Sequence, residues 1–227
     1  FYTFYILVET ASLVIFFHAC QKDEKISVWQ MLMQGIKKSS RILKPNVSNV
    51  LFVVYLLLMA PFVNIMAFSS LTDTIKMPEF AMEYITGSTW FTLLFCAGFF
   101  FLVIKMIIWL FSIHFFVLED VDFKEARLRS RSLIKGRFGK TVLIMAALNV
   151  GLIVAVYLVY ITIIGFLYLL IGLPGADTSA MVSLLSILNT FNASVIAISS
   201  AIAVPCNFAV ISSLYYKYLA EDGIVIQ

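Results

Sequence analysis

The sequence predicts an all-α membrane protein, a polytopic transmembrane helical bundle. Three observations predict it: hydrophobic residues make up 62% of the 227 positions, charged residues make up only 13%, and the mean hydropathy is +0.99. A soluble fold of this size could not cover so much apolar surface, and ordinary soluble domains hold about 25% charged residues. The composition therefore excludes a soluble globular enzyme, a coiled coil and a nucleic-acid-binding domain, and no nucleic-acid partner is expected.

Five apolar segments are long enough to span a bilayer, which takes about 20 residues. They cover approximately residues 1–19, 50–70, 90–117, 141–171 and 181–205, within a single integral membrane domain over 1–227. We expect the fourth to tilt or bend, because it is longer than a bilayer requires. Pro205 is expected to kink or end the fifth. The first segment lacks an initiator methionine and a charged n-region, so we expect a truncated N-terminus with at least one helix upstream.

Lysine and arginine are distributed unevenly between the connecting loops. Residues 20–49 hold six cations and residues 118–140 hold seven, whereas the other two loops share only Lys76. Cytoplasmic loops carry the excess of positive charge in membrane proteins. The sequence therefore predicts that both cation-rich loops and the C-terminus are cytoplasmic.

Each cation-rich loop also contains an amphipathic pattern with helical spacing, at about residues 28–43 and 123–138. We expect both to form helices that lie in the membrane interface. In the second, Asp122 is expected to be the N-cap. Its apolar stripe consists of Phe123, Ala126, Ser130, Leu133, Ile134 and Phe138.

Two ionisable residues, Glu9 and Lys105, lie deep inside predicted spans. Each is about 11–12 residues from the cytoplasmic end of its span, or roughly 16–18 Å along a helix. A lone charge at mid-bilayer costs at least about 2.5–3.5 kcal/mol. We therefore expect an intramembrane charged pair, in direct contact or through water. In the alternative, the Lys105 ammonium reaches the interface while Glu9 is protonated or bonded to a neighbouring hydroxyl.

The fifth span is unusually polar for its depth. Asn189 and Asn192 are candidates to line a polar groove for a lipid headgroup or a glycerol moiety. Asn64, Asn149 and Asn207 could join this groove from other segments. The alternative is tight helix packing with hydroxyl and amide hydrogen bonds, as is common between transmembrane helices.

The second cation-rich loop is a candidate site for anionic lipid headgroups. Its basic residues are Arg127, Arg129, Arg131, Lys135 and Arg137. Each cation near an anionic surface contributes about 1 kcal/mol, although ordinary topogenic charge would give the same composition. Carboxylates lie beside them at Glu119, Asp120, Asp122 and Glu125, but no histidine lies among them and basic residues follow at once, so no metal site is expected. The sequence also shows no recognisable catalytic motif.

Several segments, in order, resemble the membrane domain of bacterial glycerophosphoryl diester phosphodiesterases. They are residues 9–15 (Glu-Thr-Ala-Ser-Leu-Val-Ile), 41–45 (Arg-Ile-Leu-Lys-Pro), 76–85, 116–126, 132–138 (Ser-Leu-Ile-Lys-Gly-Arg-Phe), 205–207 (Pro-Cys-Asn) and 214–216 (Leu-Tyr-Tyr). The resemblance covers nearly the whole chain. It implies a location in the bacterial plasma membrane, in contact with the bilayer and its anionic headgroups.

The resemblance also implies a covalently attached catalytic domain, a metal-dependent barrel that follows the membrane domain. Such a barrel hydrolyses glycerophosphodiesters to glycerol 3-phosphate and an alcohol, and its signature begins with His-Arg-Gly. Here His18 precedes Ala19 and His114 precedes Phe115. No catalytic residue can therefore be assigned to this segment, and we expect no cofactor in it, with a divalent metal in the downstream domain.

By the resemblance, the function is to anchor that catalytic domain and to present lipid-derived substrate to it. A rival hypothesis comes from a different class of protein. In it the chain is a stand-alone small transporter or lipid-handling protein, and Glu9, Lys105 and the polar fifth span form its pathway.

Overall fold

The computed structural model describes residues 2–43, 46–63, 83, 87–171 and 178–223. The regular elements in these ranges are all helices, as the sequence predicts. In chain order they are α1 (Tyr2–Gln21), α2 (Val28–Ser39), the 3₁₀ helix η1 (Ser40–Leu43), α3 (Val47–Val63), α6 (Thr89–Ile108), α7 (Ser112–Leu118), α8 (Phe123–Ile134), α9 (Phe138–Ile171) and α10 (Thr178–Glu221).

Three helical stretches among the described residues are long and apolar enough to cross a membrane: Phe4–Gln21, Thr89–Leu118 and Phe138–Ile163. The membrane class is therefore confirmed. The count of five spans stays a prediction. Of the second predicted span, 50–70, the structure describes the part in α3, where Val47–Leu58 is apolar but shorter than a full span. Residues 64–70 of that span lie outside the described ranges.

The third predicted span, 90–117, is not one continuous helix. Helix α6 ends at Ile108 and α7 begins at Ser112. A side chain from α8 satisfies the backbone at this break, since the Ser130 hydroxyl donates to the Ile108 carbonyl (2.8 Å) and accepts from the Phe111 N–H (3.2 Å). Helix α6 alone has 20 residues, which extend over about 30 Å and match the thickness of a bilayer's hydrocarbon core.

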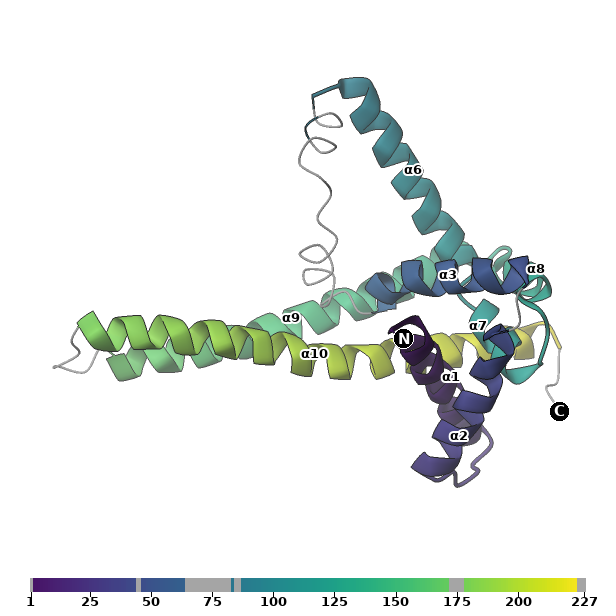
Figure 1. Ribbon diagram of the computed structural model, residues 1–227, viewed down its shortest axis with the longest axis horizontal. Helices are drawn as coiled ribbons and strands as arrows, with labels where there is room; N and C mark the ends of the chain where they lie inside the picture. Colours follow the sequence, from purple (N-terminus) through teal and green to yellow (C-terminus); the bar gives the residue numbers. More distant parts are fainter. Residues whose placement is uncertain (1, 44–45, 64–82, 84–86, 172–177, 224–227) are drawn as a thin grey trace.

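The hydrophobic core lies at one end of the molecule. Helix α7 is buried from Ser112 to Val117 and packs there with α1, α8 and the second half of α10. The largest fully buried side chains include Phe52, Phe111 and Tyr215. Helices α9 and α10 run side by side away from this core, and α6 diverges from them (Figure 1). The core therefore fixes the ends of the helices, while most of α6 and α9 stays exposed for lipid.

Helix α8 shows the predicted apolar stripe, which is buried in the protein core from Phe123 to Ile134. Asp122 is the N-cap, as expected, without a side-chain hydrogen bond. The predicted end at residue 138 is wrong, because the helix stops at Ile134. Gly136 has φ +81°, a conformation that favours glycine and ends helices, and α9 begins at Phe138.

Helix α2 and η1 together cover the first predicted amphipathic segment. Helix α2 packs on α1 at Gly35, which is buried. A Cβ added to Gly35 would lie 3.2 Å from the Val8 carbonyl oxygen and would meet the Ser12 hydroxyl, so a larger residue here requires α1 or the Ser12 side chain to shift. The apolar side chains of Trp29 and Met33 are exposed, as expected of a helix whose apolar face meets lipid.

Helix α10 does not end at Pro205 but continues without interruption to Glu221. A proline inside a helix removes one hydrogen bond, and contacts with neighbouring helices can make up for it. Two residues later, the Asn207 amide is fully buried and bonds Asn149 of α9. Beyond it, Ile211 and Leu214 lie in the core. These contacts hold the helix in place on the C-terminal side of the proline.

Candidate functional site

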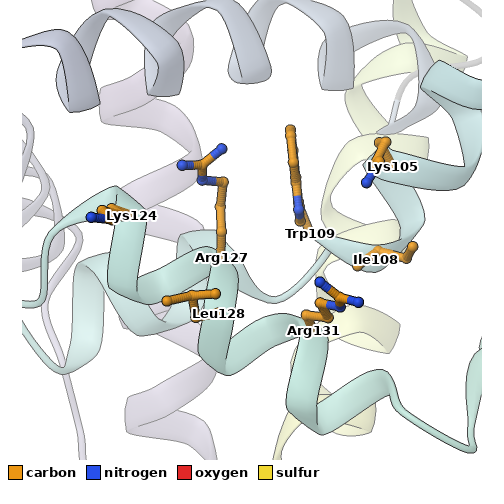
Figure 2. A pocket seen from close by; sticks show the side chains of 7 residues that line it. All are labelled: Lys105, Ile108, Trp109, Lys124, Arg127, Leu128 and Arg131. Carbon is orange, nitrogen blue, oxygen red and sulfur yellow. The ribbon is translucent and has the colours of Figure 1, made fainter.

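The candidate site is a pocket of about 300 Å³ between the end of α6 and one face of α8 (Figure 2). Helix α6 contributes Lys105 and Ile108, and Trp109 follows at the helix break. The α8 residues of the pocket recur at intervals of three and four, which places them on one face of a helix. They are Lys124, Arg127, Leu128 and Arg131.

The Trp109 ring lies in the middle of the pocket. The Arg127 guanidinium carbon lies 5.0 Å from the Trp109 ring centroid and 5.1 Å from that of Phe123. In Figure 2, Lys105 and Arg131 lie on the other side of the Trp109 ring, and Lys124 extends away from it at the edge. Stacking on aromatic rings fixes the Arg127 side chain in place, so the pocket presents a pre-oriented cation.

The pocket has an excess of positive charge. In the described part of the chain, the ion pairs join Lys38 and Arg41 to Asp120, Arg129 to Glu119 and Glu125, and Arg137 to Glu221 and Asp222. None of these pairs involves Lys105, Lys124, Arg127 or Arg131. The Arg127 Nε is buried and has no hydrogen-bond partner among the described residues. A bound anion would offset the mutual repulsion of these cations.

Of the five basic residues predicted to bind headgroups, some line the pocket and others form ion pairs within the protein. Arg127 and Arg131 line the pocket, and Lys135 lines an adjoining hollow. Arg129 is engaged elsewhere, since its hydrogen bond to Glu125 raises its pKa. Arg137 is engaged as well: its hydrogen bond to Asp222 raises the arginine pKa and lowers that of the aspartate. Both residues stabilise the fold and are not available to a ligand in this arrangement.

Sequence reasoning did not assign the other two cations of the pocket, Lys105 and Lys124, to this site. Lys124 is four residues before Leu128 and seven before Arg131, so its helical spacing would have identified it. Lys105 was assigned to mid-bilayer because the third span was expected to continue to residue 117. It lies three residues before the end of α6, about 4.5 Å along the helix axis. Its depth in the bilayer stays a prediction, and its ammonium lies 5.2 Å from the Phe101 ring centroid.

Glu9 is half-buried on α1. The ion pairs of the described residues do not include one between Glu9 and Lys105. A contact between the two through water stays a prediction.

Two of the five asparagines proposed for a polar groove meet in the structure. The Asn149 Nδ2 donates to Asn207 Oδ1 (3.1 Å), and the Asn207 Nδ2 donates back to Asn149 Oδ1 (3.3 Å). This reciprocal pair joins α9 to α10, in agreement with the packing alternative. Asn64 and the side chains of Asn189 and Asn192 lie outside the described residues, so the groove itself stays a prediction.

Asp120 is a structural residue that the sequence did not reveal. Its carboxylate accepts from Lys38 Nζ (2.6 Å) and Arg41 Nη1 (2.5 Å), and its carbonyl accepts from Arg41 Nη2 (2.6 Å). These contacts, here called the Asp120 clasp, join the two cation-rich loops. The Arg137 pairs bring the end of α10 to the same region. The two loops and the end of α10 thus lie close together, which is required if all three are on the same side of the membrane. Their assignment to the cytoplasm stays a prediction.

The described residues offer no set of ligands for the metal that the resemblance implies. Over residues 2–43, 46–63, 83, 87–171 and 178–223, no three His, Cys, Asp or Glu side chains are close enough together to hold an ion. His114 is fully buried and its Nε2 lies 2.8 Å from the Ser212 hydroxyl, a contact within the core. We therefore derive no metal-dependent step from this part of the chain.

Comparison with known proteins gives one match. A family model described as the membrane domain of glycerophosphoryl diester phosphodiesterase matches residues 1–225. No curated protein and no solved structure matches the chain. The family match covers the same extent as the resemblance noted from the sequence.

Proposed function

The chain belongs to the family of membrane domains of glycerophosphoryl diester phosphodiesterase, and on this premise we propose that it anchors a catalytic domain and presents phosphodiester ligands to it. The membrane is that of a bacterial cell, with the cation-rich loops and the C-terminus in the cytoplasm. A separate metal-dependent domain performs the hydrolysis, and the present chain supplies the binding site at the bilayer surface.

One observation supports this proposal above the others, namely the excess positive charge around Trp109. A phosphodiester carries one negative charge on two non-bridging oxygens. A guanidinium can donate two parallel hydrogen bonds to such oxygens, and a lysine ammonium adds charge and further donors. Arg131 and Lys105 offer this set on one side of the Trp109 ring, and Arg127 adds positive charge on its other side.

The test is a titration of the purified chain with glycerophosphoglycerol, a soluble phosphodiester, in nanodiscs made of zwitterionic lipid. Heat of binding is measured for the native protein and for Arg127→Gln and Arg131→Gln. A lost charged hydrogen bond is worth about 1.5–3 kcal/mol, so each variant should bind about tenfold more weakly or worse.

The matched control is Lys140→Gln, which removes an exposed cation from the start of α9 outside the pocket. It should bind like the native protein. Equal affinities for the native protein and both arginine variants would overturn the assignment of the pocket, as would an equal loss in the control.

A further inference from the structure

A second hollow, of about 600 Å³, adjoins the cationic pocket. Ile108, Leu128 and Arg131 line both spaces, so the two adjoin at these residues. The remaining apolar walls of the hollow include Ile104 of α6 and Phe138 at the start of α9. The cationic pocket thus adjoins a hollow that is mainly apolar, although Ser132 and Lys135 also line it, and an amphiphilic ligand suits the two together.

The order of the two spaces along α6 follows the order of a bilayer. Lys105, Ile108 and Trp109 of the pocket lie at the end of α6, which is about 30 Å long. The pocket therefore lies at the level of lipid headgroups. Ile104 lines only the hollow and lies one turn before Ile108, on the same face of α6 and further into the hydrocarbon. A lipid standing in the bilayer would meet the two spaces in this order, headgroup first.

Resting on the proposed function, we infer that the ligand of this site is an anionic phospholipid held from the membrane, and not a water-soluble phosphodiester. Its phosphate lies beside Lys105 and Arg131, on one side of the Trp109 ring, and Arg127 adds positive charge on the other side. The first part of one acyl chain lies in the hollow, between Ile104 and Phe138. A soluble diester would use the cations and leave the hollow without a ligand.

Trp109 provides a reporter inside the site. The other two tryptophans, Trp29 and Trp90, are 69% and 81% exposed, so Trp29→Phe and Trp90→Phe leave the core intact. The resulting protein, with Trp109 alone, is reconstituted in phosphatidylcholine vesicles that contain a minor fraction of brominated lipid. Bromine on an acyl chain quenches only a nearby indole. Brominated phosphatidylcholine gives the level of quenching expected for random mixing.

Brominated phosphatidylglycerol should quench Trp109 more strongly than brominated phosphatidylcholine does, because each nearby cation favours an anionic lipid. The difference should correspond to an enrichment of the anionic lipid at the site of about fivefold or more over random mixing. Arg131 is exposed, so Arg131→Gln should keep the fold while reducing this enrichment severalfold. Lys140→Gln should leave it unchanged. Added glycerophosphoglycerol should displace the lipid only at concentrations far above that of the lipid.

The outcomes separate this inference from the proposed function. Equal quenching by the two brominated lipids, together with tight binding of glycerophosphoglycerol, would overturn the lipid and leave the phosphodiester site in place. If the affinity for glycerophosphoglycerol and the enrichment of brominated phosphatidylglycerol are both the same in the native protein and in Arg131→Gln, the site itself is overturned. Enrichment that is the same in Arg131→Gln would place the bound lipid elsewhere on the protein and would also overturn the inference.

Discussion

Asp120→Asn tests whether the Asp120 clasp joins the two cation-rich loops. Asp120 has φ +56°, a conformation that asparagine and aspartate both tolerate better than other side chains. Asparagine also keeps an oxygen that can accept from Arg41, and the backbone carbonyl contact of Asp120 is unchanged. The substitution therefore removes the negative charge with little change in shape or backbone freedom.

The expected loss of stability follows from the exposure of the charged groups. The side chains of Lys38 and Arg41 are 28% and 31% exposed, and that of Asp120 is 56% exposed. Water screens ion pairs of this kind, and each contributes about 0.2–1 kcal/mol. Two pairs together should contribute about 1 kcal/mol, which corresponds to about 2–4 °C in melting temperature for a chain of this size.

The measurement is thermal unfolding in detergent, for the native protein and the variant, at low and high salt. The difference should shrink by half or more in 1 M salt, where the screening length falls to about 3 Å. Glu24→Gln removes an exposed carboxylate from the first cation-rich loop and should leave the melting temperature unchanged. An unchanged melting temperature in Asp120→Asn, or a difference that salt does not affect, would refute the reasoning.

Three further predictions concern other contacts, each measured by thermal unfolding. Gly35→Ala should destabilise the protein by about 1–2 kcal/mol, because overpacking against α1 outweighs the gain in helix propensity; a rise in melting temperature would contradict the close packing. Asn207→Leu should cost about 1 kcal/mol, since the Asn149 amide loses its partner on α10 and keeps only the Met145 carbonyl, and adding Asn149→Leu should recover part of the loss. Arg137 lowers the pKa of Asp222 below its ordinary value of 3.8, so this pair stabilises the folded state above pH 4. Its contribution should disappear as the pH falls through the lowered pKa, where native protein and Asp222→Asn should become equally stable, and a constant difference would argue against the pair.

The sequence alone determined the class of protein and the approximate position of its helices. The apolar content leaves only a membrane bundle, and the apolar stripe of α8 is the one that the structure buries from Phe123 to Ile134. The cation-rich loops also lie together, as their charge predicted. These features are local, because they depend on composition and on helical spacing within one segment.

The tertiary structure decided what each charged residue does. The break after Ile108 depends on Ser130 of another helix, and it places Lys105 three residues before the end of α6. Which arginines are free for a ligand depends on carboxylates that are distant in sequence, as for Arg137 and Asp222. Periodicity within one segment carries no information about such partners. The cationic pocket and its adjoining hollow therefore became visible only when α6, α8 and α9 were brought together.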